Sequence, residues 1–169
     1  MDMLIQKAKR RDKEAFAKLM KDNEKSMYKV AKAILKNDDD VADAMQETIL
    51  KCWEKIATLK KNEYFKTWMI RILINKCNAM YRQNKRFISE NNCPERQIFE
   101  EGFANVEWKS LLRYLEEKYR TVIILYYVEG FKVREIAEIL DISESTVKAR
   151  MVTARQKIGD IIAVEGSAR

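Results

Sequence analysis

Residues that interrupt helices are scarce in this chain, which has only four glycines and one proline among its 169 residues. The residues that abound instead, lysine, glutamate, alanine, leucine, isoleucine and methionine, favour helices over sheets. Apolar residues also recur every three or four positions through most of the sequence, which is the period of an amphipathic helix. The sequence therefore predicts an all-α fold.

The one proline lies in the only long interruption of this periodicity, residues 87–105, which also hold a glycine and several asparagines. Helical periodicity precedes this segment and resumes at Val106. A chain of this length can form two small domains on a linker. We therefore predict helical domains at residues 1–86 and 106–169, joined by a flexible linker at 87–105.

Charge is distributed unevenly along the chain. The formal net charge is +9 over residues 1–88, −4 over residues 89–108 and +2 over residues 109–169. A basic N-terminal half indicates a polyanionic partner, although an excess of charge that serves solubility gives the same balance. The pattern points to nucleic acid without proving it.

The residue types also exclude several kinds of site. Histidine is absent, which removes imidazole catalysis and the usual zinc ligand sets. Cys52, Cys77 and Cys93 show no CxxC spacing, so we expect reduced thiols in a cytosolic protein. No stretch approaches the roughly 20 apolar residues of a membrane span, and the N-terminus lacks the apolar core of a signal peptide. We predict a cytoplasmic chain with no metal, no cofactor and no membrane insertion.

The C-terminal segment has the pattern of a helix-turn-helix between Val133 and Ile158. Apolar residues predict the inner face of the first helix (Ile136, Ala137, Leu140) and of the second (Val147, Met151, Ile158). Ser143 precedes the second helix, where its hydroxyl can accept hydrogen bonds from backbone N–H groups. This layout can place the second helix in the major groove of DNA. An ordinary helical hairpin with a basic outer face is the alternative.

The same segment resembles the C-terminal domain of extracytoplasmic-function (ECF) sigma factors. The similarity rests on L-x-x-K-Y-R at Leu115–Arg120, E-I-A-x-x-L at Glu135–Leu140 and T-V-K-x-R at Thr146–Arg150. Asp141 replaces a usual glycine, Ala149 a common serine and Thr153 a common arginine. The resemblance implies recognition of a minus-thirty-five promoter element by Ser145, Thr146, Lys148, Ala149, Arg150, Val152, Thr153 and Arg155. Response regulators end in a similar domain, so the N-terminal half has to distinguish the two classes.

In the N-terminal half, Asp43 to Thr48 resemble the D-x-x-Q-E-[ST] stretch that sigma factors place on a coiled coil of the polymerase β′ subunit. Asp43, Gln46, Glu47 and Leu50 fall on one face of the expected helix. An acidic, polar face suits a partner helix that carries arginines. A solvated face of an amphipathic helix is the alternative.

The next stretch, Phe65–Arg86, holds six basic residues and no acid. A helix with an apolar inner face and a basic outer face can lie on a membrane or follow a nucleic-acid strand, and the need to pack against the preceding helix favours the strand. The stretch is similar to the F-x-x-W-[LM]-x-x-I-x-x-N helix with which the family opens the minus-ten element. The resemblance assigns that element to Leu59, Phe65, Trp68, Arg71, Asn75, Lys76 and Arg82.

Taken over most of the chain, the resemblance implies an alternative sigma factor with no catalytic residue. Its partners would be core RNA polymerase (β′ and β subunits), promoter DNA and an anti-sigma factor, which holds it at the membrane where that factor is membrane-bound. The acidic linker has two interpretations, a mimic of a nucleic-acid strand in the polymerase or a solubilising spacer.

Two rival functions make different demands on the sequence. A DNA-binding regulator with a sensing domain needs a ligand or phosphoacceptor site in residues 1–88, but Asp38–Asp40 follow a helix rather than an apolar strand. A metal-dependent nuclease would need those acids to converge on one ion. Three consecutive residues at the start of a helix point in diverging directions, which disfavours that use.

Overall fold

The computed structural model describes the backbone of residues 1–91 and 111–167, and the side chains of residues 1–86 and 111–164. Every regular element in these ranges is helical, and no strand occurs among them, so the predicted all-α fold is confirmed. The chain divides into two compact units, Met1–Cys93 and Pro94–Arg169. This division falls within the predicted linker. Residues 87–91 of that linker belong to a helix, and its other residues lie outside the described part of the chain.

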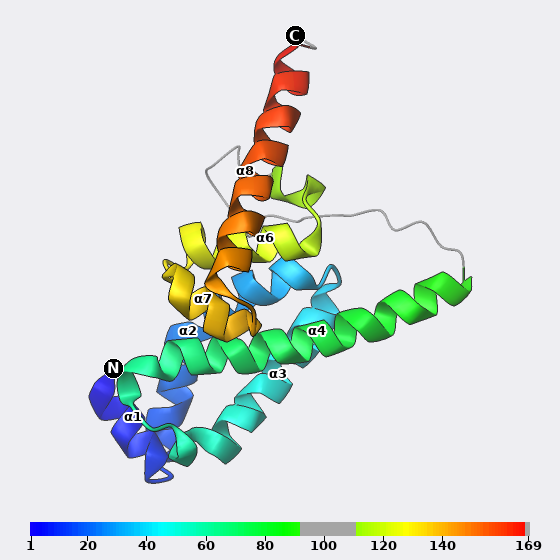
Figure 1. Cartoon of the computed structure of the whole chain (residues 1–169). Helices are drawn as coiled ribbons and strands as arrows, with labels where there is room; N and C mark the ends of the chain where they lie inside the picture. Colours follow the sequence, from blue (N-terminus) through cyan, green and yellow to red (C-terminus); the bar gives the residue numbers. More distant parts are fainter. Residues whose placement is uncertain (92–110, 168–169) are drawn as a thin grey trace. The chain divides into compact units, whose positions relative to one another are not determined.

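The N-terminal unit is built from four α-helices and two short 3-10 turns (Figure 1). They are α1 (Asp2–Lys9), α2 (Lys13–Ile34), α3 (Asp38–Lys55), η1 (Ile56–Thr58), η2 (Asn62–Tyr64) and α4 (Phe65–Asn91). Helices α2, α3 and α4 pack on one another, and α1 packs on α2. Their shared core is apolar and includes Leu19, Met27, Ile34, Ile56, Met69, Ile70, Leu73 and Ile74.

Helix α2 is continuous through Asn23. The Asn23 side chain is buried and donates from Nδ2 to the Leu19 carbonyl at 2.8 Å, so its amide is satisfied inside the helix. At the start of α2, the Asp12 carboxylate accepts from the Ala15 N–H at 3.0 Å. Helix α1, which the sequence analysis did not identify, buries Ile5 and Ala8.

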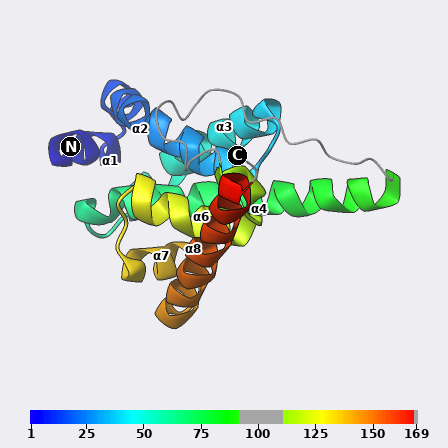
Figure 2. The same cartoon turned by 90° about the horizontal axis from the view of Figure 1, so that it is seen from above.

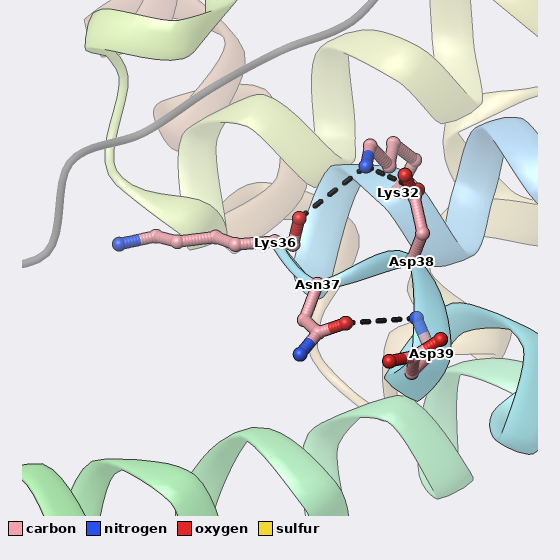
Figure 3. Close-up of polar contacts among 5 residues, drawn as sticks. All are labelled: Lys32, Lys36, Asn37, Asp38 and Asp39. Atoms are coloured by element: carbon pink, nitrogen blue, oxygen red, sulfur yellow. Dashed lines mark hydrogen bonds and ion pairs between the residues drawn. The ribbon is translucent and has the colours of Figure 1, made fainter.

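The corner between α2 and α3 is held by a buried lysine (Figure 3). The Lys32 side chain is 4% exposed, and its Nζ lies 2.5 Å from the Asp38 carboxylate and 3.3 Å from the Lys36 carbonyl. The N-cap of α3 is Asn37, whose side chain accepts from the Asp39 N–H at 2.8 Å. The acids Asp38–Asp40 occupy the first turn of α3, where their charge complements the helix dipole.

The C-terminal unit contains η3 (Leu112–Tyr114), α6 (Glu117–Ile123), the π-helical turn η4 (Ile124–Val128), α7 (Val133–Leu140) and α8 (Glu144–Ser167). Helices α6 and α7 pack on α8 (Figure 2), and the C-terminal part of α8 extends beyond them (Figure 1). Gly130, with φ +72°, follows η4 where the sequence predicted a helix end. The core at this junction includes Val122, Ile123, Leu125, Ile136, Val147, Met151 and Ala154.

Candidate nucleic-acid and partner-binding surfaces

The four side chains predicted to bind a partner on α3 lie together on its exposed face. Asp43, Gln46 and Glu47 are exposed, and Leu50 is 63% exposed beside them. The opposite face is buried through Val41, Ala44, Thr48 and Cys52. Met45, Ile49 and Trp53 are half-buried. The result is an acidic, polar surface with one aliphatic side chain at its end.

The C-terminal end of α3 is fixed by an arginine from the turn that follows α1. Arg11 adopts φ 68° and donates to the Trp53 carbonyl at 2.6 Å and to the Glu54 carbonyl at 3.4 Å. Its guanidinium lies 5.3 Å from the centre of the Trp53 ring, and Phe16 meets that ring edge-on at 5.0 Å. A cation at the last carbonyls of a helix satisfies their unpaired acceptors and complements the helix dipole. The end of the α3 surface is therefore held in place.

The residues predicted to contact the minus-ten element divide into two groups in the structure. Arg71, Asn75 and Arg82 are exposed along one side of α4, and Trp68 and Lys76 are half-buried beside them. Leu59 and Phe65, at 7% and 1% exposure, belong to the core. The two buried side chains anchor the two ends of the connection between η1 and α4, and their predicted contact with DNA stays a prediction.

This connection also exposes three side chains that the sequence analysis did not single out. Lys60, Lys61 and Tyr64 are exposed, and the Lys61 ammonium lies 5.7 Å from the centre of the Tyr64 ring. Exposed aromatic rings next to cations can stack on unpaired bases and attract phosphate. In the sequence these residues are a tyrosine and two lysines in a polar loop. That combination is too common in loops to indicate a binding site by itself.

The α3 and α4 surfaces are joined by polar contacts between the helices. The Lys76 ammonium on α4 lies 2.5 Å from the Glu47 carboxylate on α3. Further along α4, the Asn84 Nδ2 donates to the Asp40 carboxylate at 2.7 Å. A residue predicted for DNA and a residue predicted for polymerase are thus partners of each other.

In the C-terminal unit, the turn between α7 and α8 has the geometry of a helix-turn-helix. Asp141 takes the left-handed conformation, φ 55° and ψ 47°, that a usual glycine would adopt there. The Ile142 N–H donates to the Ala137 carbonyl at 3.1 Å. Ser143 then accepts from the Thr146 N–H at 3.1 Å, which confirms its expected role as the cap of α8.

The inner faces of these two helices follow the sequence pattern with one exchange. Ile136 and Ala137 are buried in α7 as expected, but Ile139 is buried in place of Leu140, which is half-buried. In α8, Val147 and Met151 are buried as expected, together with Ala154. Ile158 is half-buried.

The residues predicted for the minus-thirty-five element occupy the outer side of α8. Ser145, Lys148, Ala149, Val152 and Arg155 are exposed, whereas Thr146, Arg150 and Thr153 are half-buried. Lys148 makes no hydrogen bond or ion pair with any residue in the described ranges. Arg155 differs, because its Nε donates to the Tyr127 hydroxyl at 2.8 Å and its guanidinium lies 5.7 Å from that ring. This contact supports a packing role for Arg155.

The acidic and thiol side chains of the described residues bear on whether the chain holds a metal site or a reactive cysteine. Within the described residues, no three His, Cys, Asp or Glu side chains are placed to share a metal ion. Cys52 and Cys77 are unpaired and buried, and burial raises the pKa of each thiol to about 12. No helix in the described ranges is both long and apolar enough to span a membrane.

Comparison with known proteins matches both units to one family. Residues 19–87 match the model of sigma-70 region 2, and residues 106–158 match that of sigma-70 region 4. The chain is 29% identical to RNA polymerase sigma factor SigV of Bacillus subtilis over 151 residues, covering 88% of this chain and 91% of SigV. It is 27% identical to the ECF sigma factor SigW of the same species over 181 residues, covering 94% and 96% of the two chains.

Solved structures show the same fold. The chain is similar to CnrH, solved in complex with the cytosolic domain of CnrY, with a TM-score of 0.72 and 22% identity over 96% of this chain and 97% of that one. It is also similar to the sigma factor RpoE of Bartonella quintana, solved with the anti-sigma factor NepR, with a TM-score of 0.70 and 23% identity over 82% and 91% of the two chains.

Proposed function

The chain belongs to the ECF group of the sigma-70 family, and we propose that it directs transcription initiation by binding core RNA polymerase and opening promoter DNA. Sigma factors are transcription regulators rather than enzymes. The observation that carries the proposal is the order of the two matched regions, region 2 before region 4, each with exposed polar side chains at positions of its motifs.

The first step is attachment to the polymerase. The exposed α3 face offers Asp43, Glu47 and the amide of Gln46 to a basic partner surface, with Leu50 as an apolar contact at its end. Carboxylates pair well with arginine because the bonds are charge-assisted and can be bidentate. We propose that this face binds the β′ subunit, while the C-terminal unit binds the β subunit.

The second step is capture of the opened minus-ten strand by α4 and the connection before it. Arg71 and Arg82 supply positive charge for phosphates, and the exposed amide of Asn75 can pair with a base edge. Trp68 lies with its ring centre 6.0 Å from that of Phe65, so its first role is to support the start of α4.

The third step is recognition of the minus-thirty-five element by α8. The cap at Ser143 fixes the first turns of α8, which carry Ser145, Lys148 and Ala149 on the exposed side. A helix presented in this way can enter the major groove with its N-terminal residues at base edges. Residues 1–86 would then serve as the polymerase and minus-ten domain, 87–105 as the linker and 106–169 as the minus-thirty-five domain.

An anti-sigma factor is the proposed regulator. The structures of RpoE and CnrH similar to this chain were solved with NepR and with the cytosolic domain of CnrY, respectively. A protein of this type would hold the chain inactive by covering its polymerase-binding surfaces. A chain that acts on RNA polymerase would lie in the cytoplasm. It would lie at the membrane while a membrane-bound anti-sigma factor holds it.

Run-off transcription from genomic fragments, combined with permanganate footprinting, tests the proposal. We expect specific transcripts and reactive minus-ten thymines only when the chain and core polymerase are both present. The double variant Asp43→Arg/Glu47→Arg should lose capture of core polymerase, whereas Asp22→Arg, a reversal of an exposed acid on α2, should not. Absence of reactive thymines with the wild-type chain would contradict the proposed function.

A further inference from the structure

The connection between η1 and α4 is anchored at its ends and in its middle by different parts of the molecule. Leu59 and Phe65 are buried in the core at the two ends. Between them, η2 contacts α1, a helix that lies some 60 positions earlier in the sequence (Figure 1). The exposed Lys60, Lys61 and Tyr64 therefore stand on a segment whose middle is supported by α1.

A side-chain hydrogen bond joins α1 to the middle of this connection. The Asn62 Nδ2 donates to the Asp2 Oδ1 at 2.7 Å, and the Gln6 Nε2 donates to the other oxygen of the same carboxylate at 3.2 Å. Asn62 is half-buried, so its amide is partly shielded from water. Gln6 and Asp2 lie one turn apart on α1, which orients the carboxylate towards the loop.

Helix α1 is itself fixed to the rest of the unit. Ile5 and Ala8 are fully buried against α2. The turn after α1 places Arg11 on the last carbonyls of α3. A helix anchored at both places is a rigid support, so a contact from Asp2 can fix the position of the loop.

We propose that Asp2 and Asn62 are positioning residues for promoter opening, and that α1 holds the Leu59–Phe65 connection in the conformation that receives the minus-ten strand. This inference rests on the proposed function. Neither side chain needs to contact DNA. Together they determine where Lys60, Lys61 and Tyr64 stand relative to the start of α4.

Three variants separate the hydrogen bond from other effects. Asp2→Asn keeps an acceptor oxygen for Asn62 and should open promoters like the wild type. Asn62→Asp places two carboxylates against each other and should reduce open complex by about threefold to tenfold, the effect of losing one hydrogen bond. The double variant Asp2→Asn/Asn62→Asp reverses donor and acceptor, so it should recover the wild-type yield.

The measurement is permanganate reactivity of the minus-ten thymines in complete holoenzyme, across promoters with single minus-ten substitutions. Asn62→Asp should also discriminate less between these promoters while capturing core polymerase normally, which a general loss of folding would not produce. Asn62→Ala, a milder change, provides a second variant if Asn62→Asp unfolds.

The outcomes are distinguishable. Recovery by the double variant supports the inference. Wild-type opening by both Asn62→Asp and Asn62→Ala overturns it, as does a double variant that stays defective, because Asn62 would then act directly on DNA or polymerase. A wild-type chain that opens no promoter with core polymerase overturns the proposed function as well.

Discussion

The two units present their binding residues in opposite ways. In the N-terminal unit, Glu47 and Lys76 are predicted for different partners yet are paired with each other across α3 and α4. In the C-terminal unit, Lys148 has no partner in the described ranges, and α8 is held by residues further along, through Arg155 with Tyr127 and Lys157 with Glu116. In the first unit the paired residues are thus predicted for two different partners, whereas in the second unit one predicted DNA residue, Arg155, is paired within the fold and another, Lys148, is not.

Lys148→Ala should have the largest effect of the substitutions that follow. We expect the holoenzyme to lose about 1–3 kcal/mol of its preference for the cognate minus-thirty-five element, because a base contact would be removed. The thermal unfolding midpoint should not change. Fluorescence anisotropy with preferred and scrambled elements gives the measurement, and equal weakening on both would refute base reading by Lys148.

The matched control for this experiment is Arg155→Ala, which lies on the same helix. Removing Arg155 breaks its hydrogen bond to Tyr127, so the C-terminal unit should unfold at a lower temperature. Its effect on DNA binding should be similar for the two elements. If Arg155→Ala instead reduced only the preference for the cognate element, Arg155 would read bases, and the assignment of packing to Arg155 and base reading to Lys148 would be wrong.

Asn75→Ala tests a residue of the N-terminal unit that is predicted to contact the minus-ten element. Asn75 is exposed on α4, so the helix should stay folded and capture of core polymerase should be normal. The free energy of open-complex formation on duplex promoter should become less favourable by about 1 kcal/mol, the net value of one hydrogen bond. A pre-melted promoter bubble should restore part of it, because strand separation is then complete. Wild-type permanganate reactivity would remove Asn75 from the mechanism.

The Glu47–Lys76 pair should show a smaller effect in a double-mutant cycle. Because both side chains are partly exposed, the coupling of Glu47→Gln and Lys76→Gln in the free energy of unfolding should be about 0.2–1 kcal/mol. Urea unfolding in a Trp108→Phe background reports on the N-terminal unit, since the remaining tryptophans are Trp53 and Trp68. Zero coupling would mean that the pair does not contribute to the stability of the α3–α4 contact.

The smallest expected effect concerns Glu116. Its hydrogen bond from Lys118, assisted by Lys157, lowers the pKa of the carboxyl from the ordinary value of 4.5. The ionised form therefore stabilises the folded state above the unfolded pKa, and this stabilisation disappears as the pH falls through the lowered folded pKa. Unfolding midpoints of the wild type and Glu116→Gln should differ slightly near neutral pH and converge in acid. A difference that persisted there would assign the effect to packing.

Features of the structure that depend on local chemistry could be predicted from the sequence. Ser143 caps α8 and Asp141 takes a left-handed conformation, as expected from the residue types and their places. The α3 surface was also found, because its members recur at the helical period. The motifs that resembled the family selected these residues from many other exposed charges.

What the sequence did not show depends on tertiary contacts. Ala44 and Thr48 are buried in α3 while the larger Met45 and Ile49 are half-buried, so side-chain size did not indicate which residues of the inner side lie deepest. The Thr48 hydroxyl donates to the Ala44 carbonyl at 2.7 Å, which allows a polar residue inside the core. Lys32 is buried against expectation, because its partners at the α2–α3 corner exist only after folding.

The length of α4 gives the Asn84–Asp40 contact a mechanical role. A helix of 27 residues is about 40 Å long, and among its described side chains Cys77 is the last that is fully buried. Asn84 lies seven residues further along, about 10 Å, and its amide is bonded to Asp40 on α3. The contact between the two helices therefore extends about 10 Å beyond the buried core. A bond so far from the core resists rotation of α4 against α3 more effectively than one close to it, because it acts on a longer moment arm.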